Sequence, residues 1–574
     1  MNEKTNMSSR KDVDGKENEA MALDLQRTMS GKHDQTQVSD QTLEQNFNVF
    51  SLISTATSLI ATWEALGSTM ATGLISGGPV SLVYGYLLAI IGTLATALSL
   101  SELASMFPSA GGQYYFVVQL APKNFRAAWG YASGWICIFA WQTFTAAAPF
   151  LGATMIQGLV VLNYPSYSYE RWHGTLIYCA FLGLAALVNV FAIRIMPLIL
   201  HATFALHVGF WAVLIIVICV ISPSRNSAEF VFTTYINESG WSSDGVAFSI
   251  GLLSSTYVLA GYDSATHLTE EIRDPERNVP RAMLASIIIN GALGFGFLLV
   301  VLFCMGDITE AMETTTGYPI IEIFYQISRS KAAASAMTCA LIVIAALATV
   351  PLLLTASRML WSFAQDAGLP CSKMLSRVDS KHHVPLPAIA VTSVFLILIG
   401  LLNIGSTTAF NAIVSLGTVG LYISYLMPIL LIFYRRIARP ASLPYGPFRL
   451  GKLGVGVNLV SIIYTVYVSI FLLFPPYQPV TAQNMNYAPV VLGGVLVLSA
   501  VWWFVKGKSQ FVGPVFDTIE GRPALDDAII EGPGSTEVQF YVTTLAAYRF
   551  DLDYQACRRV VVVVTGLQQP ALPR

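Results

Sequence analysis

Charged residues are scarce in this sequence. Asp, Glu, Lys and Arg make up only 11% of the 574 residues, whereas a soluble domain carries about 25%. The hydrophobic share is 54% and the mean hydropathy is +0.59. One buried helix cannot account for this shortfall, so most of the chain must lie in lipid. The formal net charge is −2, and no basic excess indicates a nucleic-acid partner.

Motifs for metal binding and catalysis are also missing. The seven cysteines are scattered, with no CxxC pair and no Cys/His cluster, so neither a zinc site nor a disulfide framework is expected. The sequence has no P-loop, no nucleophile elbow and no HExxH motif. An ATP-driven pump or a membrane hydrolase would need one of these, so we expect no enzyme, no metal and no other cofactor.

Apolar runs long enough to cross a bilayer recur through residues 47–508. A spanning helix needs about 20 mostly apolar residues, because lipid cannot pair with exposed backbone groups. The weakest boundary lies between the fourth and fifth runs, where Ile195-Met196-Pro197 must form a tight turn. The expected fold is an all-α polytopic membrane protein with about 12 transmembrane helices, near residues 50–76, 79–106, 126–160, 173–196, 198–222, 245–268, 282–306, 332–361, 386–404, 409–434, 453–474 and 488–506.

Two polar segments flank this transmembrane domain. Residues 1–46 carry charges of both signs and lack the apolar core of a signal peptide, so we expect a disordered cytosolic tail. Residues 509–574 form a second tail, also expected to be cytosolic, and its apolar run at 560–564 is too short to cross a membrane.

Basic residues favour one side of the predicted membrane. With a cytosolic N-terminus, the outer loops hold only Arg171, Arg225, Arg329 and Lys331, and the remaining loop cations between residues 123 and 508 lie inside. This bias predicts that both termini are cytosolic. The same topology places the sequon Asn237-Glu238-Ser239 outside, where its glycosylation stays an open question.

Glu64 is the only charged side chain between Glu44 and Glu102, and it falls near the middle of the first span. An isolated charge in lipid is costly, so such a residue is a functional candidate. The following Gly67-Ser68-Thr69 favours an interrupted helix, whose free N–H groups attract a carboxylate. Glu64 itself would attract a cation, such as an amine, or carry a proton. The structural alternative is a protonated Glu64 that is hydrogen-bonded between helices.

The sixth span holds a second stretch of small and hydroxylated residues, Ser254-Ser255-Thr256-Tyr257-Val258-Leu259-Ala260-Gly261. Two interrupted helices, five spans apart, are typical of an inverted repeat. Asp263 follows toward the cytosolic half, where it would either line an inner pathway or be a structural partner of Arg358 or another inner charge.

Further titratable residues are candidates for proton coupling or gating. Glu270 lies at the exit of the sixth span, although Glu270 and Glu271 are expected to pair with the nearby arginines 273, 277 and 281. The fifth span carries His201 and His207, which can exchange protons near neutral pH or simply pack as neutral rings.

Aromatic side chains could form a cage for an alkylammonium group through cation–π attraction. Tyr257 is the strongest candidate because it lies inside the interrupted stretch of the sixth span. Packing or interfacial anchoring is the alternative for the whole set, which comprises Trp63, Phe139, Trp141, Tyr257 and Tyr262.

Several motifs, in order along residues 47–508, resemble the amino acid/choline permeases, and most closely the fungal GABA and choline permeases of the amino acid–polyamine–organocation superfamily. The motifs that carry the resemblance are Gly77-Gly78-Pro79, Tyr84-Gly85, the segments 99–105, 107–114 and 261–271, Pro275, Val279-Pro280-Arg281, Ser357-Arg358, Ala364-Gln365-Asp366, Leu369-Pro370 and the segment 446–451.

The resemblance implies a five-plus-five inverted repeat with broken helices 1 and 6, two peripheral helices and alternating access. It places a substrate carboxylate at Gly67, Ser68 and Thr69, and a substrate amine at backbone carbonyls from Tyr257 to Gly261. Two departures stand out. The first stretch reads Gly-Ser-Thr where many relatives have two glycines, and the fifth span lacks the lysine that some proton-coupled relatives use.

The expected function is therefore secondary active import of a GABA-like amino acid or a related small amine, with protons as the coupling ion. A choline permease is the alternative within this class, and a transporter-like nutrient sensor is the alternative outside it. The plasma membrane is the expected location, with the vacuolar membrane as the alternative. The lysines of the N-terminal tail suit ubiquitin-driven endocytosis, which would make ubiquitin ligase machinery a partner: Lys4, Lys11, Lys16 and Lys32.

Overall fold

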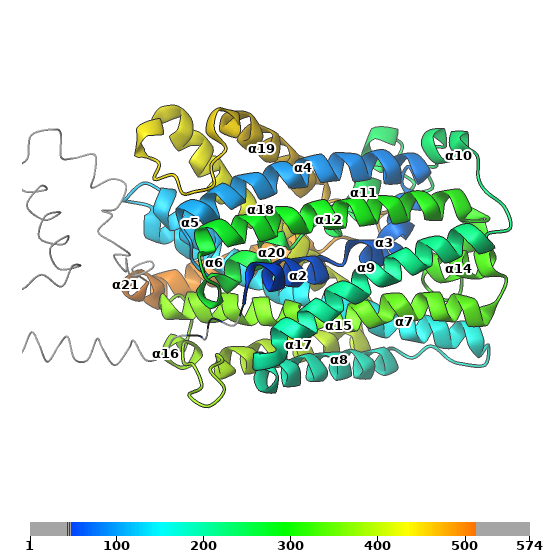
Figure 1. Cartoon of the computed structure of the whole chain (residues 1–574), viewed down its shortest axis with the longest axis horizontal. Helices are drawn as coiled ribbons and strands as arrows, with labels where there is room; N and C mark the ends of the chain where they lie inside the picture. Colours follow the sequence, from blue (N-terminus) through cyan, green and yellow to red (C-terminus); the bar gives the residue numbers. More distant parts are fainter. Residues whose placement is uncertain (1–42, 44, 46, 512–574) are drawn as a thin grey trace, which may run out of the picture.

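The computed structural model describes residues 43, 45 and 47–511. Within this part of the chain, 12 helices are long and apolar enough to cross a membrane, which confirms the predicted all-α polytopic fold (Figure 1). The predictions for the two tails fall on residues that lie almost entirely outside the described ranges.

The first five spans include two divided helices. A tight turn between the fourth and fifth spans is confirmed: it is a short 3₁₀ helix, η1 (Ile193–Ile195). It lies slightly earlier than the predicted Ile195-Met196-Pro197, because Met196 and Pro197 already belong to the first turn of α9. Proline fits the first turn of a helix because its missing N–H would be unpaired in any case. The spans are α2 (Val49–Ile60) with α3 (Thr62–Ile75), α4 (Gly78–Met106), α6 (Arg126–Thr145) with α7 (Ala147–Asn163), α8 (Arg171–Phe191) and α9 (Met196–Ile221).

The remaining spans begin with another divided helix. Because the first and sixth spans are both interrupted, the predicted pair of broken helices is confirmed. The spans are α11 (Asp244–Tyr257) with η2 (Tyr262–Glu271), α12 (Pro275–Cys304), α15 (Lys331–Gln365), α17 (Leu386–Gly405), α18 (Thr407–Ala438), α19 (Gly454–Phe471), and α20 (Ala488–Trp502) with its continuation η5 (Trp503–Gly507) and α21 (Lys508–Gln510).

Short helices cap the two ends of the bundle. Figure 1 shows α5, α16 and α21 at one end and α10 and α14 at the other. The described chain enters and leaves the bundle at the first of these ends. The short helices are α5 (Gln113–Leu120), α10 (Ala228–Thr233), α13 (Ile308–Met312), α14 (Pro319–Ser328), α16 (Ser372–Leu375), η3 (Pro440–Ser442) and η4 (Gly451–Leu453).

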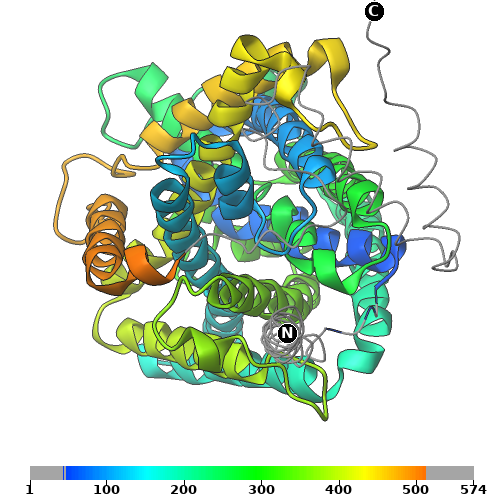
Figure 2. The ribbon, with the colours of Figure 1, turned by 90° about the vertical axis from the view of Figure 1, so that its left-hand side faces the viewer.

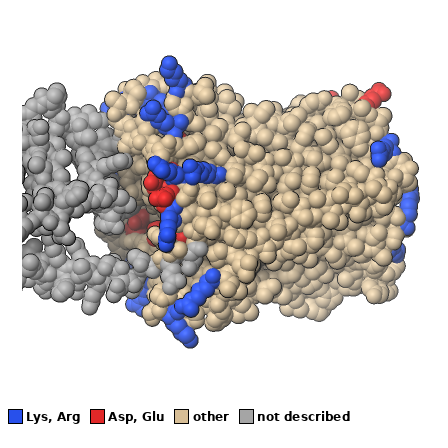
Figure 3. Space-filling view, in the orientation of Figure 1, with Lys and Arg blue, Asp and Glu red and all other residues tan. Residues whose placement is uncertain are grey.

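The surface of the bundle separates charged ends from an apolar middle. In Figure 3 the Lys and Arg side chains gather at the two ends, most of them at the end that carries α5 and α21, and the surface between is almost free of charge. A belt of this kind is what lipid tails require.

The interrupted helices lie inside the bundle. In the most apolar stretch of the first span, 78% of the residues are buried. The corresponding share in the twelfth span is 17%. Viewed along the bundle, α20 lies at its outer edge (Figure 2). The peripheral helices therefore shield a central group of spans from lipid, and the candidate site lies in that central group.

Candidate functional site

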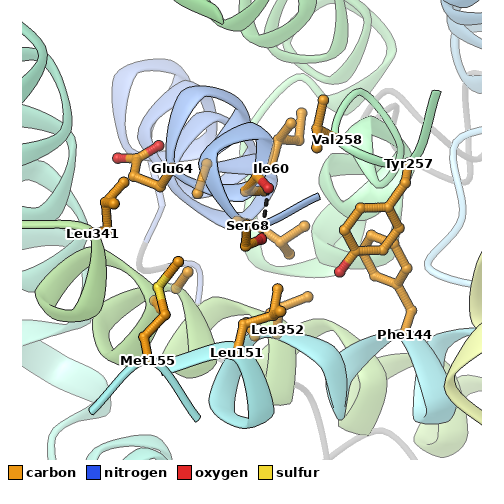
Figure 4. Close-up of a pocket in the computed structure, with 16 residues that line it drawn as sticks. Ile60, Glu64, Ser68, Phe144, Leu151, Met155, Tyr257, Val258, Leu341 and Leu352 are labelled. Atoms are coloured by element: carbon orange, nitrogen blue, oxygen red, sulfur yellow. Dashed lines mark hydrogen bonds between the residues drawn. The ribbon is translucent and has the colours of Figure 1, made fainter. Parts of the chain in front are cut away.

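A small cavity lies between the two interrupted helices and the third and eighth spans (Figure 4). Its volume is about 50 Å³, enough for a few water molecules. Among the described residues that line it, Glu64 is the only one with a charged side chain, and most of the others are apolar. Any polar solute in this cavity would therefore be oriented chiefly by Glu64.

The first span is interrupted at Ala61. This residue has φ 43° and ψ 52°, a left-handed conformation that L-residues rarely adopt. The prediction that the interruption lies at Gly67-Ser68-Thr69 is wrong, because all three residues lie within α3. The two hydroxyls bond within the helix and leave it continuous: Ser68 Oγ and Thr69 Oγ1 donate to the carbonyl of Ala65 at 2.6 and 3.1 Å.

The three residues of this stretch have different surroundings. Ser68 lines the cavity. Gly67 is buried and faces Ile320 of α14, whose Cγ1 would lie 3.4 Å from a Cβ at this position. Thr69 Oγ1 also lies 3.4 Å from the carbonyl oxygen of Ser254, so it connects α3 with α11. Only Ser68 is thus placed to contact a bound solute in this conformation.

Glu64 pairs with a histidine of the fifth span. His207 Nδ1 in α9 lies 2.7 Å from Glu64 Oε1, and both side chains are buried. Glu64 Oε2 and His207 Nε2 have no hydrogen-bond partner among the described residues. Two residues singled out separately in the sequence thus form one unit, which can share a proton and still keep a carboxylate oxygen unpaired.

The sixth span is interrupted between Tyr257 and Tyr262, within the stretch predicted for it. Gly261 has φ 97°, and a Cβ there would come within 3.0 Å of Leu59 Cδ2, so glycine is required by both backbone and packing. Thr62 Oγ1 donates to the carbonyl of Val258 at 2.8 Å. The interruptions of the two helices therefore lie directly against each other.

Of the stretch predicted to bind the substrate amine, Tyr257 and Val258 line the cavity. Ser255, Ala260 and Gly261 are buried but are not among its lining residues. The ring of Tyr257 lies 5.6 Å from that of Phe144. Figure 4 shows these two rings across the cavity from Glu64. An aromatic wall thus faces an acidic one.

The other aromatic residues proposed for an ammonium cage do not reach the cavity. Trp63 Nε1 donates to the carbonyl of His207 at 3.3 Å, and Trp141 Nε1 donates to Asp263 Oδ2 at 3.1 Å. Phe139 and Tyr262 are likewise absent from the lining. The aromatic contribution comes instead from Tyr257 and Phe144, the second of which the sequence pattern did not indicate.

Asp263 is enclosed by hydrogen-bond donors in this conformation. Its carboxylate accepts from Gln113 Nε2 at 2.5 Å, from Trp141 Nε1, and from the hydroxyl of Tyr425 at 2.5 Å. The alternative that Asp263 pairs with Arg358 is wrong, because Arg358 pairs with Glu271 at 2.6 Å. Asp263 thus joins η2 to α5, α6 and α18.

The expected pairing of Glu271 with the loop arginines is wrong for the same reason. Successive residues of a 3₁₀ helix point about 120° apart, so Glu270 and Glu271 at the end of η2 face different ways. Glu271 is 2% exposed and faces α15, whereas Glu270 is exposed.

Asn290 is a site residue that the sequence analysis missed. Its side chain contacts both halves of the first span, through Thr57 and Thr62. A signal was present: Asn290 is the only amide or charged side chain between Arg281 and Asp307, and a lone polar group in a membrane helix usually has a specific partner.

Comparison with known proteins agrees with this architecture. A family model described as amino acid permease matches residues 47–496. A choline transporter of Saccharomyces cerevisiae is 32% identical over 473 residues, covering 82% of this chain and 83% of the relative. The amino-acid permease BAT1 of Arabidopsis thaliana is 32% identical over 489 residues, covering 83% and 94%. A swainsonine transporter of Arthroderma benhamiae is 29% identical over 493 residues, covering 85% and 96%.

Proposed function

The chain belongs to the amino acid permease family and is therefore a transporter for amino acids or amines; on this premise we propose that it is a proton-coupled secondary carrier that imports a small amine-bearing solute by alternating access. The solute binds at this cavity with its ammonium group toward Glu64, after the cavity widens beyond the few water molecules for which it has room in this conformation. The observation that carries this proposal is that Glu64 is the only charged side chain among the described residues of the cavity wall.

A carboxylate in this position favours a cationic ligand. Glu64 is 4% exposed, and its Oε2 lacks a hydrogen-bond partner among the described residues. A buried charge is costly without a counter-charge, and an ammonium group supplies one. The rings of Tyr257 and Phe144 on the opposite wall add cation–π attraction and apolar contact.

Between the two solutes expected from the sequence, these contacts favour choline over GABA. A choline molecule is a cation without a carboxylate, so it needs only the acidic and aromatic walls. GABA would also need donors for its carboxylate at the start of α3, where the N–H of Thr62 already donates to Asn290 Oδ1 at 3.2 Å. GABA stays the second candidate, because the other N–H groups in the first turn of α3 would still attract a carboxylate and several relatives are named amino-acid permeases.

Proton coupling is assigned to the Glu64–His207 pair. With the imidazole neutral, Nδ1–H donates to the carboxylate; an added proton on Nε2 makes the ring cationic. The protonated ring then holds Glu64 Oε1, while the ammonium group of the solute meets Oε2, which has no partner among the described residues. We assign the inward transition to the state with both cations bound, so that the solute enters together with the proton.

The proposed orientation in the membrane rests on the distribution of basic residues. Lys and Arg predominate at the end that carries α5 and α21 (Figure 3), and the positive-inside rule makes that end cytosolic. Both termini are then cytosolic, and the plasma membrane is the proposed location.

The test is uptake of radiolabelled choline and GABA, side by side, into proteoliposomes of the purified chain under an inward proton gradient. Gradient-dependent accumulation of choline supports the proposal, and accumulation of GABA alone selects the second candidate. Competition of both for a bound amino acid, without accumulation, would overturn the substrate assignment. If the chain shows neither flux nor binding of these solutes, the result would favour a transporter-like nutrient sensor.

A further inference from the structure

We propose that Asn290, which does not line the cavity, is a positioning residue that holds the interrupted first and sixth helices and thereby places the groups of the cavity wall. The inference rests on the proposed function, since it concerns the same site.

The side chain of Asn290 joins the two halves of the first span. Its Nδ2 donates to the carbonyl of Thr57 at 3.2 Å, in the last turn of α2, and its Oδ1 accepts from the backbone N–H of Thr62 at 3.2 Å, the first of α3. Nδ2 also donates to the carbonyl of Ser286 at 3.0 Å in its own helix. An interrupted helix leaves backbone groups unpaired, and here a third helix, α12, satisfies them.

Asn290 acts on the wall of the cavity from behind. It is 0% exposed, and it is not a lining residue. Between its two contacts on the first span lie Leu59, Ile60 and Ala61, which all line the cavity. Glu64 follows two residues after Thr62. The hydrogen bonds of Asn290 therefore fix both ends of the segment that the solute would meet.

The same contacts reach the sixth helix. Thr62, held by Asn290 through its N–H, donates its hydroxyl to the carbonyl of Val258 at 2.8 Å. Val258 lines the cavity at the interruption of the sixth span. Asn290 is itself fixed, since its own carbonyl accepts from the hydroxyl of Tyr86 at 3.3 Å. One chain of hydrogen bonds thus runs from α12 through both interruptions.

Losing this amide would change the local balance of the first span. The backbone N–H of Thr62 would lose its hydrogen bond to Asn290, and the carbonyl of Thr57 would lose the one it accepts from Asn290. Both groups are buried, where an unpaired polar group is costly. The strained left-handed conformation of Ala61 would then lose its support. A return of Ala61 to right-handed conformation would realign α2 with α3 and turn Glu64 away from its present place.

Two substitutions separate hydrogen bonding from packing. Asn290→Leu keeps the branched shape but has no polar atom. Asn290→Asp keeps an acceptor for the N–H of Thr62 and, when protonated, a donor for the carbonyl of Thr57. The matched control is Asn458→Leu, because Asn458 is also 0% exposed and donates across spans, to Ser99 Oγ at 2.9 Å, but lies in α19 and does not line the cavity.

The first measurement is the KM for choline in proteoliposomes, with GABA in parallel. We expect Asn290→Leu to raise this KM about tenfold, with a rise below about threefold for Asn290→Asp, the partial rescue expected when one acceptor remains. Asn458→Leu should lower thermal stability and leave KM unchanged. Equal KM rises for Asn290→Leu and Asn290→Asp, or for Asn290→Leu and the control, would overturn the assignment.

The second measurement needs no substrate. Hydrogen–deuterium exchange of the peptide that covers the interruption at Ala61 should be faster in Asn290→Leu than in the unmodified chain or in Asn290→Asp, and unchanged exchange would overturn the assignment. If the unmodified chain neither transports nor binds choline or GABA, the proposed function fails. The positioning role of Asn290 is then tested by hydrogen–deuterium exchange alone. If Asn290→Leu does not fold, Asn290→Ser replaces it in both measurements, because a serine hydroxyl can still donate to the carbonyl of Ser286 in its own helix but is too short to join the two halves of the first span.

Discussion

The imidazole of His207 and the carboxylate of Glu64 lie 2.7 Å apart, where the fifth span meets the first. Only 17% of the most apolar stretch of the fifth span is buried, and His207 lies on this narrow buried face. The fifth span therefore contributes a titratable group that contacts Glu64 of the cavity wall, while most of its own surface faces lipid. Two predictions follow from the pair.

Replacing Glu64 with Gln should weaken transport of choline more than transport of GABA. The amide keeps the shape but removes the negative charge that a quaternary ammonium group needs, and the loss of one buried charge pair is worth about 3 kcal/mol, or about a hundredfold in KM. GABA can also be held through its carboxylate, so its KM should rise less. Parallel uptake in proteoliposomes measures both values.

Glu64→Asp is the control, because it shortens the side chain but keeps the charge. Its KM for choline should lie between those of the unmodified chain and Glu64→Gln. Unchanged choline uptake in Glu64→Gln would remove Glu64 from the binding site.

Replacing His207 with Gln should uncouple transport from protons. The amide can still donate to Glu64 Oε1, so binding and exchange of solute should persist, but it cannot take up a proton. We expect accumulation under an inward proton gradient to fall to the level of passive equilibration, while counterflow of labelled against unlabelled solute continues. His201→Gln is the control, because His201 lies on the same helix and packs against Phe50 at 4.9 Å, away from the cavity lining. Gradient-driven accumulation that survives in His207→Gln would assign coupling to another group.

The architecture could be predicted because it depends on long-range composition. Twelve apolar runs, the turn at Pro197 and the interruption near Gly261 all leave strong local signals: length, a proline, or a glycine at a position that only glycine tolerates. These features are set by lipid and by backbone sterics, which act on the sequence directly.

The position of the first interruption could not be predicted in this way. Ala61 is a good helix former, so its own residue type does not indicate the left-handed conformation, and the contacts beside it, from Thr62 to Asn290 and Val258, join helices far apart in the sequence. The pairing of Arg358 with Glu271 is of the same kind, since two residues 87 positions apart meet only once the spans are packed. Contacts of this type depend on tertiary structure and leave no periodic signal.

Asn237 should carry no glycan, although its sequon lies on the side proposed to be outside. Its Nδ2 donates to the carbonyl of Trp241 at 2.9 Å and to Asp244 Oδ1 at 3.2 Å, and the hydroxyl of Ser239 is buried and donates to Asn237 Oδ1 at 2.7 Å. Modification would replace one of the two Nδ2 hydrogens, so one of the two bonds that Nδ2 donates would be lost, and it needs an exposed loop. Treatment of the expressed chain with a peptide N-glycosidase should leave its electrophoretic mobility unchanged.

A positive control for this assay is available in the same chain. Glu313 is exposed between α13 and α14 and precedes Thr314 and Thr315, so Glu313→Asn creates a sequon by one substitution. We expect the enzyme to shift the mobility of this variant. A shift in the unmodified chain would contradict the prediction for Asn237, and no shift in Glu313→Asn would contradict the proposed topology.

The last prediction concerns Asp366, which directly follows the eighth span. Burial raises the pKa of Asp366 from 3.8 to about 6, while a hydrogen bond from the hydroxyl of Tyr114 at 2.7 Å opposes the rise. A carboxyl group with a raised pKa binds its proton more tightly in the folded state, so its contribution to stability is complete below pH 3.8 and is lost as the pH rises through about 6. The free energy of unfolding should therefore fall by about 1 kcal/mol between pH 5 and 7.

Thermal unfolding of the purified chain in detergent at these two pH values measures the effect. The side chain in Asp366→Asn still accepts the hydrogen bond from Tyr114 but cannot ionise. The fall in the free energy of unfolding between the two pH values should therefore be smaller in this variant than in the unmodified chain. Tyr114→Phe removes the bond that stabilises the ionised carboxylate and should move the loss of stability to higher pH. An unchanged pH dependence in Asp366→Asn would show that another group carries it. A loss that moves to lower pH in Tyr114→Phe would contradict the assigned hydrogen bond.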